Sequence, residues 1–175
     1  LVLPPVLVGY FLLLLFGVRG PLGSWLRDAF GIQLAFTAEG AALATAVMAF
    51  PLMVRAIRLS FEATDRGLFE AAAVLRAGPW DRFWSMALPL AWPGVLAGAV
   101  TAFAAGLGEF GAVITFASNV EGQTQTLPLA IYSALQVPDG DATAMRLAAI
   151  SMTAAVTGLV LAELLQQWAR RRLEA

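Results

Sequence analysis

Cysteine, histidine and lysine are all missing from this 175-residue sequence, and charged residues make up only 13% of it. The lack of cysteine excludes disulfides and thiolate chemistry. The lack of histidine removes the most common general base and metal ligand, which argues against a membrane metalloprotease or a nucleophile–histidine pair. All 11 basic residues are arginine and form no basic stripe, so we expect no nucleic-acid partner.

Apolar runs, by contrast, fill the chain, which is 59% hydrophobic with a mean hydropathy of +0.76. A soluble domain usually contains about a quarter charged residues, so a soluble protein with a buried helical core is the weaker interpretation. Runs of about 20 apolar residues can cross a bilayer. They predict an all-α integral membrane protein with four spans, at about 1–17, 38–56, 88–117 and 144–166.

The first residue, Leu1, is not methionine and lies inside an apolar run. That run lacks the basic region and the small-residue cleavage site of a signal peptide. We therefore expect residues 1–175 to be a single transmembrane domain that is truncated at its N-terminus, with at least one helix missing upstream.

The arginines predict an orientation. The 55–89 loop and the C-terminal tail together carry eight of them, and the opposite side carries three. Cytoplasmic loops are enriched in basic residues, so the 55–89 loop and the C-terminus are expected in the cytoplasm. The tryptophans lie near the ends of the predicted spans, as interfacial anchors do: Trp25, Trp80, Trp84, Trp92 and Trp168.

The 55–89 loop is the most informative segment, because its pattern predicts ordered helices outside the membrane. The first, at 65–77, has a stripe formed by Leu68, Ala72 and Leu75. Gly78 and Pro79 then follow as a helix stop and a helix start. An amphipathic helix on the membrane surface is the alternative, but a stripe of alanine and leucine suits a protein groove better than lipid.

A second loop helix is expected to end at Pro89. Its apolar face is formed by Trp80, Phe83, Trp84 and Ala87. For this helix, attachment to the membrane surface and a protein contact are equally good interpretations.

Small residues recur every four positions in the third predicted span and predict a smooth packing face. They are Gly94, Gly98, Ala102 and Gly106. Packing within the subunit and a contact between two copies both fit this pattern. Gly106 is followed closely by Gly108 and Gly111. These three glycines predict a kink, hinge or break around Glu109, because glycine weakens a helix.

Glu109 is the one acid deep in a predicted span, and such residues usually face a cavity or a partner. It could belong to a transport path or lock, or it could form a structural hydrogen bond to backbone amides freed by the glycines or to an arginine. The candidate path or gate residues are Glu109, Phe110, Thr115, Ser118 and Asn119. The following loop, 118–143, is expected to contain a short helix and a turn at Pro138–Asp141.

Two stretches resemble a known family. Glu70-Ala71-Ala72, followed by Gly78, Phe83 and Leu88-Pro89, is similar to the EAA loop of ABC-importer permeases, here at 60–88. The usual loop has a glycine six residues after the glutamate, where this chain has Arg76. The second stretch, GLGEFGAVITFASNVEGQTQTLPLAIYSALQ at 106–136, resembles the molybdate permease subunits of ABC importers, and the resemblance extends over nearly the whole chain.

The resemblance implies a type I (MetI-like) importer fold that works as a homodimer in the prokaryotic cytoplasmic membrane. It implies a pair of cytoplasmic P-loop ATPases that bind ATP and Mg²⁺, and a periplasmic or lipid-anchored binding protein that delivers molybdate or tungstate. This chain would hold no cofactor, metal or catalytic residue. The resemblance assigns ATPase coupling to Leu68, Glu70, Ala71, Ala72, Leu75, Arg76 and Gly78.

Alternatives remain open at this point. A sulfate or thiosulfate permease shares part of the motif. An ion-coupled secondary transporter would use Glu109 as its proton site. An intramembrane enzyme would have to rely on serine and acidic residues alone, because histidine and cysteine are missing.

Overall fold

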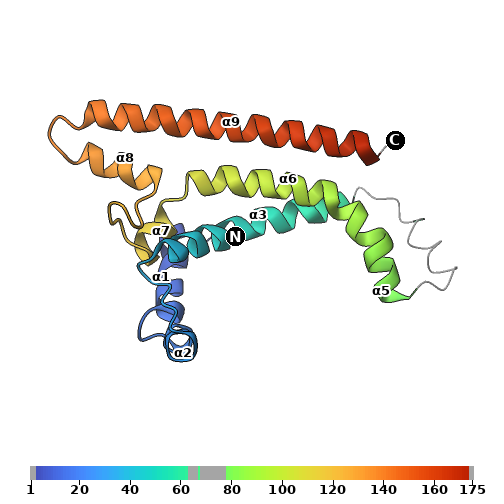
Figure 1. Ribbon diagram of the computed structural model, residues 1–175, viewed down its shortest axis with the longest axis horizontal. Coiled ribbons are helices and arrows are strands. Elements are labelled where there is room, and N and C mark those ends of the chain that lie inside the picture. Colours follow the sequence, from blue (N-terminus) through green and yellow to red (C-terminus); the bar gives the residue numbers. More distant parts are fainter. Residues whose placement is uncertain (1–2, 63–66, 68–77, 174–175) are drawn as a thin grey trace.

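The computed structural model describes residues 3–62, 67 and 78–173, and this part of the chain is all-helical with no strand, as predicted. Figure 1 shows the long helices lying side by side, with most of the short ones gathered at one end. The helices in chain order are α1 (Pro5–Phe16), α2 (Pro21–Phe30), α3 (Ala38–Glu62), α5 (Pro79–Arg82), the π-helical turn η1 (Phe83–Ala87), α6 (Leu88–Leu107), α7 (Gly111–Phe116), α8 (Leu127–Leu135) and α9 (Asp141–Leu173).

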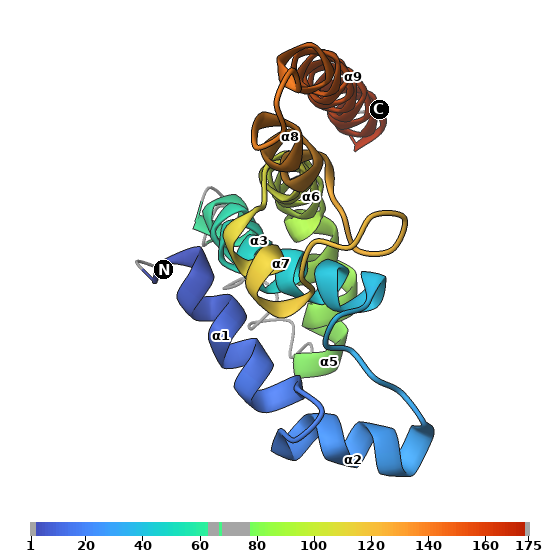
Figure 2. The ribbon, with the colours of Figure 1, turned by 90° about the vertical axis from the view of Figure 1, so that its left-hand side faces the viewer.

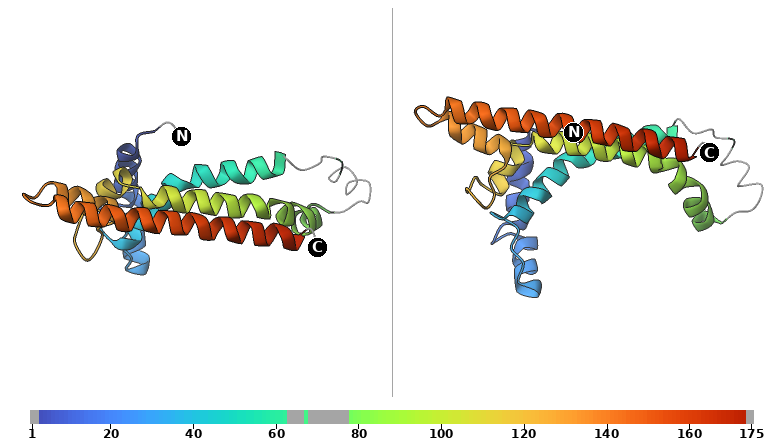
Figure 3. Two further views of the ribbon diagram at one scale, coloured as in Figure 1. Left: turned by 90° about the horizontal axis from the view of Figure 1, so that it is seen from above. Right: turned by 45° about the horizontal axis from the view of Figure 1, so that its top comes forward.

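Three helical stretches are long and apolar enough to cross a membrane: Ala38–Glu62, Pro79–Leu107 and Asp141–Leu161. α6 packs against α3 on one side and α9 on the other. Figure 3 shows the three running roughly parallel from above. The predicted spans at 38–56 and 144–166 lie within α3 and α9, both of which are longer than expected.

The third predicted span, at 88–117, is divided. α6 ends at Leu107, Gly108 caps it, and α7 begins as a separate helix at Gly111. The predicted break at the glycines is therefore present, and the ten residues after Leu107 do not continue the span. On the other side the helical stretch begins earlier than predicted, at Pro79.

The first predicted span, at 1–17, is also different. α1 has 12 residues, about 18 Å at 1.5 Å per residue, which is shorter than the roughly 30 Å hydrocarbon core. It runs across the ends of the long helices (Figures 1 and 3) and joins α2 at a bend of 48°. The bend arises at Gly17–Gly20, after which Pro21 starts α2. Only the bent pair together could count as a fourth span.

Pro89 does not end the second loop helix, contrary to the prediction. α5, η1 and α6 follow one another without a break. In η1 the N–H of Leu88 donates to the carbonyl oxygen of Phe83, five residues earlier. Proline lacks an N–H and clashes with an α-helical turn before it. A wider π turn just before Pro89 accommodates that ring, so the helix continues.

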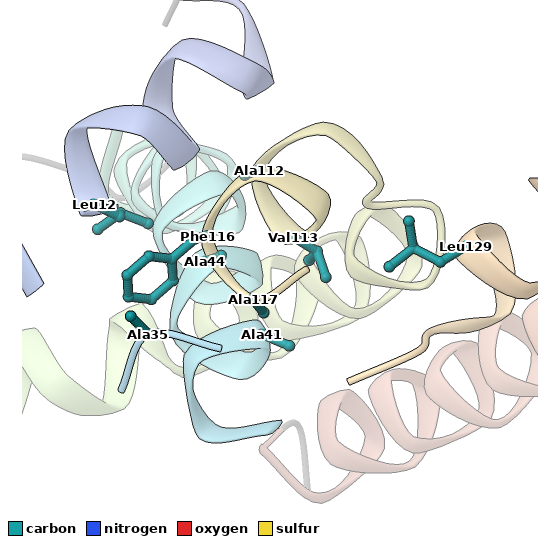
Figure 4. Close-up of a cluster of buried hydrophobic side chains, with 9 residues drawn as sticks. All are labelled: Leu12, Ala35, Ala41, Ala44, Ala112, Val113, Phe116, Ala117 and Leu129. Atoms are coloured by element: carbon teal, nitrogen blue, oxygen red, sulfur yellow. The ribbon is translucent and has the colours of Figure 1, made fainter. Parts of the chain in front are cut away.

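The hydrophobic core lies around α7. Phe116, Val113 and Leu129 are fully buried there, and Figure 4 shows them between α1, α3 and α8. The other core residues are mostly small: Leu12, Ala35, Ala41, Ala44, Ala112 and Ala117. Small side chains allow backbones to approach closely, which is how helices pack when lipid supplies no hydrophobic driving force between them.

Candidate functional site

Most of the predicted coupling residues fall outside the described part of the chain: Leu68, Glu70, Ala71, Ala72, Leu75 and Arg76. Gly78 is described. It is exposed, a β-carbon there would meet nothing within 4 Å, and its carbonyl accepts the N–H of Arg82 at 2.9 Å. Gly78 is thus the N-cap of α5 and Pro79 its first residue, as predicted for a helix start at Pro79. The predicted 65–77 helix that Gly78 would end lies, apart from Gly67, outside the described residues.

The aromatic face of the second loop helix projects outward. Trp80 is 75% exposed and Trp84 61% exposed. The ring of Phe83 lies between them, 6.4 Å from the ring of Trp80 and 5.3 Å from that of Trp84, edge to face in both cases.

The small-residue face of α6 lies against α3 of the same chain. A β-carbon at Gly94 would stand 2.5 Å from the Cβ of Ser60, and one at Gly98 would stand 3.1 Å from the Cγ of Met53. At Gly106 the nearest atom is the Cγ2 of Thr45, at 2.8 Å. In addition, Ser60 Oγ donates to the carbonyl of Leu90 at 3.2 Å. Ala102, the fourth member, faces a groove beside α3.

The Glu109 carboxylate lies where α6 gives way to α7. Its Oε1 accepts a 2.8 Å hydrogen bond from the backbone N–H of Ala112. The first amides of a helix have no partner within it, so the carboxylate satisfies one of them. Glu109 also borders a small cavity of about 130 Å³ between α3 and α6. Thr45 and Met48 are among the α3 residues on its wall.

Two further candidates are held by local contacts. The Thr115 hydroxyl donates to the carbonyl of Gly111 at 2.8 Å. A β-carbon at Gly9 would stand 2.8 Å from the Thr115 Cβ, so α1 and α7 touch closely at this point. The Phe110 ring packs edge to face on Tyr132 of α8, with ring centres 5.2 Å apart.

Ser118 and Asn119 form the turn after α7. Ser118 has φ of +70°, in the left-handed region, and its carbonyl accepts the hydroxyl of the buried Thr124 at 3.3 Å. The Asn119 amide donates to Ser133 Oγ at 2.7 Å, and Asn119 Oδ1 accepts from Gln125 at 3.0 Å. The candidates all lie in segment 109–119. Their hydrogen-bond partners are within that segment or at Thr124, Gln125 and Ser133.

A groove of about 540 Å³ lies beside this segment, between the first half of α3 and residues 123–126. Its α3 wall is alanine apart from Thr45, and its polar wall is formed by Gln123, Thr124, Gln125 and Thr126. Thr126 Oγ1 is buried and has no hydrogen-bond partner within the described residues. The sequence predicts 123–126 only as part of the loop 118–143. Its run of four amide and hydroxyl residues is the feature that indicates a polar wall.

Charges contribute little to this region. The described residues contain no cluster of three or more acidic side chains that could hold a metal. The ion pairs found among them, Arg27–Asp28 and Arg58–Glu62, are on the surface, where such pairs contribute about 0–1 kcal/mol. The groove is lined mostly by alanine, and its polar groups are neutral amides and hydroxyls.

The described part of the chain is all-helical with three or four apolar helices, and a break such as that between α6 and α7 is typical of membrane transporters. Residues 1–174 match the family described as binding-protein-dependent transport system inner membrane component. The chain belongs to this family, so it is a membrane permease component.

Individual members of this family that resemble the chain are named for molybdenum transport. The chain is 52% identical over 172 residues to the molybdenum transport system permease protein ModB of Escherichia coli K12, covering 98% of this chain and 75% of that protein. It is 48% identical over 173 residues to ModB of Haemophilus influenzae, covering 99% and 76%. A putative molybdenum permease of Bacillus subtilis, YvgM, is 43% identical over 135 residues, covering 77% and 60%.

Proposed function

We propose that this chain is the permease subunit of an ATP-driven importer that carries molybdate, with tungstate as a congener, across the prokaryotic cytoplasmic membrane. The observation that supports this most strongly is the 52% identity, over nearly the whole chain, to a permease named for molybdenum transport. The aligned region covers 98% of the chain and so includes both the 60–88 loop and the 106–136 stretch.

The partners follow from the family. Its description names a binding protein, and we infer that the complex contains two copies of the permease, two cytoplasmic ATPases that bind ATP and Mg²⁺, and one extracytoplasmic binding protein. The arginine distribution supports placing the 55–89 loop and the C-terminus in the cytoplasm. The whole of residues 1–175 would then act as one transmembrane domain.

Coupling would start at the 65–77 helix, where Glu70 and its neighbours would fit into a groove of the ATPase. α5, η1 and α6 form one uninterrupted helical stretch from Gly78 onward. α6 packs closely against α3 at Gly94 and Gly98. A displacement of the loop would therefore move α3 and α6 together. ATP can shift the inward–outward equilibrium only by binding one state better than the other.

The path itself is proposed to pass along segment 109–119 and the adjoining groove. Gln123 lines the groove, and its side-chain amide could donate a hydrogen bond to an oxyanion without holding it tightly. Glu109, already bonded to the α7 backbone, would keep its charge away from the anion. Phe110, Thr115, Ser118 and Asn119 would form the wall or gate that α7 and its turn provide.

The test is ATP hydrolysis by the full-length permease with its ATPase in proteoliposomes. A molybdate-loaded binding protein should stimulate hydrolysis and a sulfate-loaded one should not. Equal stimulation by sulfate would replace the proposal by a general oxyanion or sulfate importer. If no ATPase co-purified and no stimulation occurred, the ion-coupled transporter with Glu109 as its proton site would become the better interpretation.

The docking role has its own test. Glu70→Lys should insert into the membrane but fail to retain the ATPase in pull-down. Glu121→Lys is the matched control, because it reverses an exposed acid in the loop on the other side of α6. Normal ATPase retention by Glu70→Lys would remove the proposed docking role and leave the anion specificity untouched.

A further inference from the structure

α2 is amphipathic, unlike the uniformly apolar α1 that precedes it. At 100° per residue, its apolar side chains fall on one arc and its polar ones on the opposite arc. The apolar arc is formed by Leu22, Trp25, Leu26, Ala29 and Phe30, and the polar arc by Ser24, Arg27 and Asp28. Trp25 is 58% exposed and Phe30 63% exposed, with their rings edge to face at 5.4 Å.

The helix packs closely on the end of α1 at its N-terminus and ends in a left-handed glycine cap. Gly20 and Gly23 press against backbone carbonyls at the end of α1: a β-carbon at Gly20 would stand 2.5 Å from the oxygen of Leu14, and one at Gly23 would clash with the oxygen of Gly17. At the other end Gly31 adopts φ of +68°, and its N–H donates to Arg27 O at 2.9 Å. The direction of α2 is thus set by α1 and not by a flexible tether.

α2 lies at the end of the molecule where α1, α7 and α8 are gathered. Figure 1 shows it below the short-helix end of the bundle, and Figure 2, which views that end, shows α2 lying across the view beyond the tip of α1. Seven residues join it to the start of α3, and one of them, Phe36, donates its N–H to Phe116 O at 3.2 Å. This is the end of the long helices opposite α5 (Figure 1).

We propose that α2 lies flat in the membrane interface at this end, with Trp25, Ala29 and Phe30 among the lipid chains and Arg27 and Asp28 toward water. The partner is the lipid surface. A short helix of this pattern is typical of interfacial anchors, and tryptophan favours the headgroup level. α1, packed against α7 at Gly9, would thereby be held at a fixed depth beside the candidate gate.

Lipid is favoured over a protein partner by continuity. Exposed apolar side chains precede α2 along the chain, at Tyr10 and Leu14 of α1 and at Val18 in the turn between α1 and α2, and the chain belongs to a membrane family. The two charges of α2 neutralise each other as a pair at 3.4 Å, so α2 offers no net charge to attract a charged protein. The inference rests on the family, and it is independent of which anion is carried.

The absence of cysteine from these 175 residues makes a labelling test direct. Ala29→Cys on the apolar arc and Asp28→Cys on the polar arc, two exposed positions about 100° apart around the helix, are made in full-length permease without other cysteines and carry a nitroxide label. The permease–ATPase complex is placed in phosphatidylethanolamine–phosphatidylglycerol vesicles. Accessibility to oxygen, which concentrates in lipid, is compared with accessibility to a water-soluble nickel chelate. We expect an oxygen-to-nickel ratio about threefold or more higher at position 29 than at 28.

Each other outcome overturns the proposal in its own way. High nickel accessibility at both positions would place α2 in water. Low accessibility to both probes at position 29 would mean protein covers it, as a second copy or another subunit. Protection of position 29 only after binding protein is added would make α2 a docking surface for that protein.

Discussion

The carboxylate of Glu109 and the backbone N–H of Ala112 are joined by a 2.8 Å hydrogen bond at the start of α7. The first turn of α7 is surrounded by α1 and α3, where unpaired amides are costly. A negative charge at a helix N-terminus is also favourable, because the helix dipole is positive there. The one acid in this region therefore has a structural task that needs no proton transfer.

A capping carboxylate should be replaceable by an amide that still accepts the same bond. We expect Glu109→Gln to retain most of its transport and stability. Glu109→Ala should lower the free energy of unfolding by about 1 kcal/mol, as removal of a capping side chain typically does, and should reduce the yield. Thermal unfolding and uptake by the reconstituted complex check both. If Glu109→Gln abolished uptake without changing the melting temperature, the proton-site interpretation would gain support.

The contact between α3 and α6 should not tolerate even one methyl group. Gly94→Ala places a β-carbon 2.5 Å from Ser60 Cβ and 3.0 Å from Ala56 O, and overpacking of this kind costs about 1–3 kcal/mol. Gly108→Ala is the matched control, because its nearest neighbour, Ala105 O, lies at 3.8 Å. Detergent melting curves should show a lower midpoint for the first variant only. Equal midpoints would mean that α3 and α6 can separate without cost.

The core around α7 should depend on Phe116, which is fully buried. Phe116→Ala should destabilise the permease by about 3–5 kcal/mol, enough to lower the yield of folded protein. Phe50→Ala removes the same atoms from a side chain on α3 that is 66% exposed, and it should change the melting temperature little. Similar losses in both variants would show that α7 is not the centre of the packing.

Ser118 offers a way to separate path from scaffold. Its φ of +70° is unfavourable for a residue with a β-carbon, so Ser118→Gly should keep or raise stability, by up to about 1 kcal/mol. If its hydroxyl meets the anion as proposed, uptake should nevertheless fall. Asp139→Gly is the control: Asp139 has φ of +59° in an exposed turn, and its replacement should leave uptake unchanged. Unchanged uptake in Ser118→Gly would remove that hydroxyl from the path.

Much of the fold could be predicted because its signals are local. The lengths of apolar runs placed α3 and α9, the glycines at 106, 108 and 111 predicted the break after α6, and the Gly78–Pro79 pair predicted the start of α5. The predictions that differed depended on non-local or unusual backbone geometry. α1 was expected to span because a 17-residue apolar run has the right composition, and the π turn before Pro89 has no simple sequence signature.

The candidate site divides in the same way. Glu109, Ser118 and Asn119 stood out as polar residues near glycines, but their hydrogen-bond partners Ala112, Thr124 and Ser133 could not be named from spacing. The polar wall at 123–126 was overlooked because a polar outer loop resembles any other until α3 is seen opposite it. The coupling residues rest on the resemblance of Glu70-Ala71-Ala72 and its surroundings.

The sequence by itself determined that this chain is helical, lies in a membrane and belongs to a transport family, because hydropathy, arginine placement and short motifs are properties of consecutive residues. Tertiary structure decided what the small residues and the half-buried acid contact. Glycine stripes fit a partner helix in the same chain or in another, and a carboxylate can cap a helix or carry a proton. Only the tertiary structure places α3 against Gly94 and the Ala112 amide beside Glu109, since close packing and hydrogen bonding depend on atoms far apart in sequence or turned by a break in the backbone.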